Sequence, residues 1–161
     1  MRLLLLLSAL FAISSLAPAA SKPNIIFILC DDLGYGDVKC LNPEGKIATP
    51  HMDRLAAEGM IFTDAHSGSS VCTPTRYGVI TGRYAWRTKL QSSVLGGLSP
   101  RLIEQGRLTV PAFLKQNGYH TACVGKWHLG MDWVKKGEVT ELGIESAAQV
   151  NNVDYTQPIA N

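Results

Sequence analysis

Several features that define large classes of protein are scarce or missing in this sequence. Only 17% of the 161 residues are charged, and 15 Lys and Arg nearly balance 13 Asp and Glu, for a formal net charge of +2. With a hydrophobic content of 46%, this excludes an intrinsically disordered chain, which has low hydrophobicity and high net charge. No cluster of Lys and Arg marks a surface that follows a phosphate backbone, so nothing supports nucleic-acid binding. No repeat of fixed period stands out either.

Cysteine is scarce as well, with four in the chain. An even number in an exported protein first suggests disulfides, but four over this length is not a disulfide-dense scaffold. Cys30 and Cys123 fall in predicted core strands, where an inert buried thiol is the default expectation. Cys40 falls in a loop, and whether any of these three cysteines forms a disulfide stays open.

Long hydrophobic runs are absent after the N-terminus. Arg2 precedes an apolar run over residues 3–16, and Ala17-Pro18-Ala19 follows with the small residues of a cleavage site. We therefore predict a signal peptide at 1–19 and an exported protein that is periplasmic, secreted or lysosomal. A membrane anchor is the alternative, but the run is short for a bilayer and two serines interrupt it. No later segment is long and apolar enough to cross a membrane.

Apolar, β-branched runs alternate with helix signals in the remainder, 20–161. Residues 24–30 read as a strand buried on both faces, and 61–63 and 119–124 as further strands. Helices are predicted from Thr49-Pro50 to Gly59, from Thr73-Pro74 to Gly82, and from Thr109 to Gly118, since each has a capping residue or Pro at its start and Gly at its end. This order favours an α/β fold with a mainly parallel sheet flanked by helices. Two clear core strands make an incomplete sheet, so we expect an N-terminal piece of a longer protein.

Two acidic residues follow the first predicted strand. Asp31 and Asp32 come where the apolar run ends and a loop with Gly34 and Gly36 begins. Ligands gather at such strand ends in open α/β sheets, and carboxylates suit Ca²⁺ or Mg²⁺. A solvated turn is the alternative for an Asp-Asp pair.

A cysteine stands just before the second predicted helix. Cys72 would lie at the positive end of the helix dipole, near free backbone N–H groups. Arg76 lies about one turn further on and can face the same place. The position suits an anion and a reactive side chain, although a lone Cys is more often a small buried hydrophobe.

Three segments resemble one enzyme family, the sulfatases. Residues 70–82, SVCTPTRYGVITG, resemble its first signature, and residues 118–128, GYHTACVGKWH, resemble its second. Residues 24–32, NIIFILCDD, resemble its first strand and metal loop. The resemblance covers roughly residues 22–133 and implies the N-terminal part of an alkaline-phosphatase-like fold.

The resemblance implies a modified cysteine as nucleophile. A separate maturation enzyme would oxidise Cys72 to formylglycine, an aldehyde that hydrates to a geminal diol. One hydroxyl would attack the sulfur of a sulfate ester and displace the alcohol. The second hydroxyl would lose its proton and expel inorganic sulfate, a step that plain Ser or Cys lacks.

The resemblance also implies roles for five other residues. Asp31, Asp32 and the matured residue 72 would bind Ca²⁺ or Mg²⁺, and the cation would polarise the sulfate oxygens. Arg76 would stabilise the formylglycine oxygens, and Lys126 would bind sulfate or the diol as a point charge. His128 would act as general base in sulfate release.

The chain also departs from the family pattern. Further Asp and Asn metal ligands, and a His and a Lys that bind sulfate, come from downstream motifs that this chain does not contain. We therefore expect the 161-residue piece alone to be inactive. Two alternatives remain: a phosphatase or phosphodiesterase of the same superfamily, and a non-catalytic secreted module that binds anions. The sequence does not select among aryl, carbohydrate and lipid sulfates.

Overall fold

The computed structural model describes residues 21–134, 136 and 153–158. The chain divides into two compact units, Met1–Tyr35 and Gly36–Asn161. The predicted signal peptide at 1–19 lies outside the described residues. Within the described ranges, no helix is long and apolar enough to cross a membrane.

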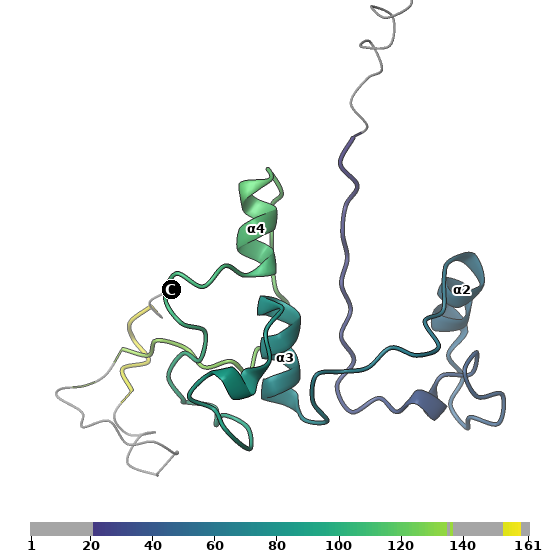
Figure 1. Ribbon diagram of the computed structural model, residues 1–161, viewed down its shortest axis with the longest axis horizontal. Helices are drawn as coiled ribbons and strands as arrows, with labels where there is room; N and C mark the ends of the chain where they lie inside the picture. Colours follow the sequence, from purple (N-terminus) through teal and green to yellow (C-terminus); the bar gives the residue numbers. More distant parts are fainter. Residues whose placement is uncertain (1–20, 135, 137–152, 159–161) are drawn as a thin grey trace, which may run out of the picture. The chain divides into compact units, whose positions relative to one another are not determined.

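In the described residues, three α-helices are formed at the places that the sequence predicts (Figure 1). They are α2 (Pro50–Glu58), α3 (Cys72–Thr81) and α4 (Val110–Gln116). A short 3-10 turn, η2 (Tyr35–Asp37), precedes α2, and a second one, η3 (Ala85–Arg87), lies between α3 and α4. Helix α3 begins at Cys72 rather than at Thr73, which makes the cysteine part of the first turn. The three helix predictions are thus confirmed, with one shifted boundary.

The helix ends show which sequence signals are used. Gly82 ends α3 in the left-handed conformation, with φ of 65°, and its N–H donates to the carbonyl oxygen of Gly78 at 2.8 Å. Thr109 caps α4 by accepting a hydrogen bond from the N–H of Ala112 at 3.3 Å. Thr49 is the N-cap residue of α2, as expected, but its side chain makes no capping hydrogen bond, because its hydroxyl donates to Asp53 Oδ1 at 3.0 Å.

The predicted strands are not formed. Residues 24–30, 61–63 and 119–124 have no strand assignment, and isolated bridge residues at Asp132 and Val153 are the β structure of the described residues. The apolar side chains that should be buried are exposed, with exposed fractions of 85% for Ile26 and 97% for Val124. A strand buried on both faces needs neighbouring strands for its backbone and helices over its side chains, and the described residues supply neither to these segments.

The same difference corrects the expectations for two cysteines. Cys30 and Cys123 were predicted to be buried in core strands, but both are exposed free thiols. Cys40 is also an exposed free thiol. Slight desolvation, then the hydrogen bond and the charge of the neighbouring Asp53 carboxylate, raise the pKa of the Cys40 thiol, and a backbone hydrogen bond opposes them.

A small core surrounds α3 in the second unit. Helix α3 packs against η3 and α4. Four buried side chains form the centre of this core: Tyr77, Ala85, Leu102 and Leu129. The N–H of Leu102 donates to the carbonyl oxygen of Leu129 at 2.9 Å, so residues near 129 lie beside residues near 102. Leu129, which follows the second signature, therefore packs in the same core as Tyr77 of α3, the helix that carries the first signature.

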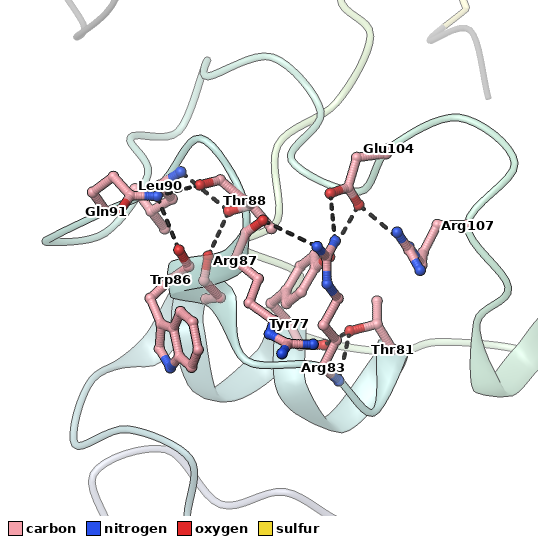
Figure 2. Close-up of polar contacts among 11 residues, drawn as sticks. Tyr77, Thr81, Arg83, Trp86, Arg87, Thr88, Leu90, Gln91, Glu104 and Arg107 are labelled. Atoms are coloured by element: carbon pink, nitrogen blue, oxygen red, sulfur yellow. Dashed lines mark hydrogen bonds and ion pairs between the residues drawn. The ribbon is translucent and has the colours of Figure 1, made fainter.

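A polar network covers one side of this core (Figure 2). The Tyr77 hydroxyl donates to Glu104 Oε2 at 3.0 Å, and Arg83 Nη1 contacts Glu104 Oε1 at 2.9 Å. Arg107 Nε lies 3.5 Å from Glu104 Oε2, and Arg83 also donates to the carbonyl oxygen of Arg87 at 3.1 Å. A backbone hydrogen bond, then the Tyr77 hydroxyl and the two guanidinium groups, lower the pKa of Glu104, while partial burial opposes them.

Candidate functional site

The site is built on the first turn of α3. Cys72 is the first residue of this ten-residue helix and is half-buried. Val71 before it is extended and caps the helix with no side-chain hydrogen bond. The N–H groups of a first helical turn have no partner within the helix and favour negative charge nearby. The sulfur atom thus occupies a place suited to an anion.

One cationic side chain contacts this cysteine, and a second one holds the backbone of the first. Lys126 Nζ donates to Cys72 Sγ at 3.2 Å, although the residues are 54 positions apart. Arg76, one turn along α3, donates from Nη1 to the carbonyl oxygen of Lys126 at 2.5 Å. The structure therefore groups three of the residues that the sequence singles out. Their chemical roles stay predictions.

His128 lies close to the same helix. Its carbonyl oxygen accepts a hydrogen bond from Thr73 Oγ1 at 3.0 Å, and its Nε2 lies 2.6 Å from the carbonyl oxygen of Leu95. Nδ1 is buried and has no hydrogen-bond partner among the described residues. The backbone of His128 is left-handed, with φ of 57°. Residues other than glycine rarely adopt this backbone conformation, and they do so where the surrounding structure imposes it.

Thr73 is a contributor that the sequence analysis missed. It is fully buried, and its hydroxyl both donates to the His128 carbonyl and accepts from the N–H of Leu95 at 3.1 Å. One signal was available, because Thr73 and the fully buried Tyr77 are four positions apart and so share the inward face of α3. The partners of Thr73 are 22 and 55 positions away, which no local pattern indicates.

The candidate metal ligands Asp31 and Asp32 belong to the first unit. Both are exposed, and Asp32 has a left-handed backbone with φ of 55°. Their oxygens suit a hard cation, but Ca²⁺ takes six to eight oxygen ligands. The described residues contain no group of three or more His, Cys, Asp or Glu side chains that could hold a metal. The pair thus fits a Ca²⁺ or Mg²⁺ site in chemistry and supplies part of the donor set.

A cavity of about 210 Å³ borders the first turn of α3 on the side of Val71 and Pro74. Trp86 from η3 lines it, stacks on Tyr84 with ring centroids 5.8 Å apart, and is 59% exposed. Ser69, Gln91, Ser92 and Ser93 also line it. The first turn of α3, which contains Cys72, therefore borders this cavity.

Comparison with known proteins places these observations in a family. The family model described as Sulfatase matches residues 23–159. The chain is 46% identical over 112 residues to an N-acetylgalactosamine-6-O-sulfatase of Bacteroides thetaiotaomicron, covering 70% of this chain and 22% of the relative. It is 43% identical over 118 residues to human steryl-sulfatase, covering 70% and 20% of the two chains. It is 40% identical over 124 residues to human arylsulfatase A, covering 77% and 24%.

A solved structure is also similar. It comes from work on glycosaminoglycan metabolism by Bacteroides thetaiotaomicron, with a TM-score of 0.65 and 46% identity, over 70% of this chain and 23% of that one. The likeness supports the predicted α/β class, although the described residues of this chain form helices and almost no strand. This chain spans about a quarter or less of the length of these four proteins. Because the family match extends over most of its residues and three differently named sulfatases share 40% or more of the aligned positions, the chain belongs to the sulfatase family.

Proposed function

We propose that this protein hydrolyses sulfate esters, with residue 72 as the nucleophile after Cys72 is oxidised to formylglycine. One observation carries the proposal. Lys126 Nζ lies 3.2 Å from Cys72 Sγ, and the backbone of Lys126 is held by Arg76 from the same helix. When formed, the hydrated aldehyde supplies a hydroxyl that can attack sulfur and a second one that allows sulfate to leave.

The chain's own residues bind and orient the ester. The Lys126 ammonium attracts the anionic sulfate oxygens as a point charge, and the first-turn N–H groups of α3 add a positive potential. Arg76 fixes the Lys126 backbone, which keeps the ammonium at the start of the helix. His128, whose carbonyl oxygen is hydrogen-bonded to Thr73 next to residue 72, would act as the general base.

A divalent cation forms part of the proposal. Asp31 and Asp32 would supply carboxylate oxygens to Ca²⁺ or Mg²⁺, which when bound polarises sulfate oxygens. We expect a chelator to abolish sulfate ester hydrolysis by the matured full-length protein and Ca²⁺ or Mg²⁺ to restore it. Hydrolysis that withstands exhaustive chelation would contradict this part.

The substrate is proposed only as a class. The relatives are named for N-acetylgalactosamine sulfate, steryl sulfate and aryl sulfate, which share little besides the sulfate ester group. We also propose export through residues 1–19 and maturation of residue 72 by a separate enzyme, since a cysteine does not oxidise to an aldehyde unaided.

The test uses the full-length protein, made in a host that contains a formylglycine-generating enzyme. Mass spectrometry of the peptide with residue 72 should show an aldehyde, and a chromogenic aryl sulfate should be cleaved in preference to the aryl phosphate. Cys72→Ala and Cys72→Ser should both lose sulfate release, because neither provides a second hydroxyl. An untouched thiol with full hydrolysis would disprove the mechanism.

The two alternatives predict different results in the same assays. Preference for the phosphate ester would favour a phosphatase or phosphodiesterase. A thiol at residue 72 without hydrolysis of either ester, from a host shown to mature another sulfatase, would favour a non-catalytic module that binds anions.

A further inference from the structure

Three residues from distant parts of the chain form a closed set of hydrogen bonds beside the proposed nucleophile. Thr73 Oγ1 donates to the carbonyl oxygen of His128 at 3.0 Å and accepts from the N–H of Leu95 at 3.1 Å. His128 Nε2 then lies 2.6 Å from the carbonyl oxygen of Leu95. Each residue thus contacts the other two, and Thr73 is the neighbour of Cys72 in α3.

This arrangement determines which ring nitrogen of His128 carries a proton. A carbonyl oxygen only accepts hydrogen bonds, so Nε2 at 2.6 Å from Leu95 O must donate. In the neutral ring the other nitrogen, Nδ1, is then an acceptor with a free lone pair. Nδ1 is buried, and no described residue hydrogen-bonds to it. It is the one basic atom of the ring left to take up a proton.

The backbone of His128 needs support to hold this orientation. Its left-handed φ of 57° costs a residue with a side chain free energy relative to ordinary conformations. Burial of Leu129 on one side and the Thr73 hydroxyl on the carbonyl oxygen oppose that cost. A hydroxyl can donate to one backbone group and accept from another at the same time, which the hydroxyl of serine also does and the side chain of valine does not.

We propose that Thr73 is a positioning residue that holds His128 with Nε2–H on Leu95 O, so that Nδ1 is the proton acceptor in the reaction. The inference rests on the proposed function. When His128 acts as the proposed base, a reacting O–H group gives its proton to the Nδ1 lone pair, the O–H electrons stay on oxygen, and the ring gains one positive charge. Nε2–H keeps its bond to Leu95 O throughout, so the ring does not turn between the neutral and charged states.

The first test needs no variant at residue 73. The matured full-length protein is labelled with ¹⁵N in its histidine rings, and the His128 signals are identified by their loss in His128→Gln. With the ring neutral, we expect Nε2 to show the shift of a protonated nitrogen and Nδ1 that of an unprotonated one. A proton on Nδ1 instead would overturn the inference.

The second test compares two substitutions of similar size. Thr73→Val removes the hydroxyl and should lower kcat for an aryl sulfate by roughly ten- to hundred-fold, as loss of an orienting partner does, with little change in KM. Thr73→Ser keeps the hydroxyl and should retain nearly the wild-type kcat and ¹⁵N pattern. Wild-type kcat in a folded Thr73→Val protein would overturn the positioning role. If that variant does not fold, the ¹⁵N measurement on the wild type still decides.

The outcomes separate this inference from the function on which it rests. A matured wild-type protein that cleaves no sulfate ester would overturn the proposed function. A wild-type protein that cleaves the ester with the proton on Nδ1 would overturn only the assignment of the ring nitrogen and of Thr73.

Discussion

Gly130 follows His128 by two positions and has a left-handed φ of 74°. A Cβ atom there would collide with the backbone carbonyl of Pro100, since the N–H of Met131 donates to Ser99 O at 3.1 Å and draws the two segments together. Glycine is required for both the conformation and the close approach. Gly130 therefore allows the segment after the second signature to pack closely against Ser99 and Pro100.

Gly130→Ala should lower the free energy of unfolding by about 2 to 4 kcal/mol, the combined effect of overpacking and a positive φ. Gly106→Ala is the matched control, because Gly106 has φ of 76° but no atom within 4 Å of the added Cβ. That variant should lose only about 1 kcal/mol, from the backbone conformation alone. Denaturant unfolding of both proteins measures the difference, and equal losses would show that the approach to Pro100 is unimportant.

Substitution of Lys126 is expected to lower the activity toward a sulfate ester. Lys126→Met removes the ammonium 3.2 Å from residue 72 but keeps the length of the side chain. We expect kcat/KM for a sulfate ester to fall by roughly ten- to hundred-fold, the effect of one charged hydrogen bond. Lys115→Met in α4 should leave kcat/KM unchanged. Equal activity of the two variants would remove Lys126 from the proposed site.

At the scale of elements, the helices depend on local signals. Thr109→Ala should destabilise the protein by about 1 kcal/mol, because the N–H of Ala112 loses its acceptor at the start of α4. Thr109→Ser keeps a hydroxyl there and should unfold close to the wild type. Thermal or denaturant unfolding compares the two, and an Ala variant as stable as the Ser variant would argue against capping.

The contact between α3 and the segment near 104 should depend on pH. The pKa of Glu104 is lowered by its backbone hydrogen bond first, then by Tyr77 and the two arginines. A lowered pKa in the folded state means that ionised Glu104 stabilises the fold above its ordinary pKa of 4.5, and this contribution is lost as the pH falls through the lowered value.

The measurement is the free energy of unfolding of the wild type and of Glu104→Gln from about pH 6 to about pH 3, the range that linkage to a carboxyl group predicts. We expect the wild type to be the more stable at the upper end and the difference to shrink toward the lower end. A difference that does not change with pH would mean that the charge of Glu104 is unimportant.

At the scale of the whole molecule, apolar side chains remain in contact with water in both units. Ile26 and Phe27 in the first unit are 85% and 68% exposed, and Phe62 and Val124 in the second are 72% and 97% exposed. Large exposed apolar areas mark surfaces that bind further protein.

We expect the isolated 161-residue chain to bind a hydrophobic dye strongly and to cleave no chromogenic aryl sulfate, even with Ca²⁺ and a matured residue 72. A full-length matured relative serves as the positive control for both measurements. Turnover comparable to that relative would show that these residues suffice for catalysis.

The parts of this protein that local sequence determined are those whose interactions span one or two turns. Proline and threonine at the start of α4, glycine after α3, and the spacing of Cys72 and Arg76 are all within that range. Helix hydrogen bonds are made between residues four apart, so these signals act without the rest of the chain. The helices and the candidate cysteine could therefore be predicted.

Tertiary structure alone decided the rest, because those contacts join residues with no local relation. Lys126 reaches Cys72 across 54 positions, and Thr73 joins Leu95 and His128 across 22 and 55. The strand predictions for the apolar runs are wrong for the described residues, because a strand forms only when a partner accepts its backbone hydrogen bonds. A pattern along one segment contains no information about whether that partner is in place.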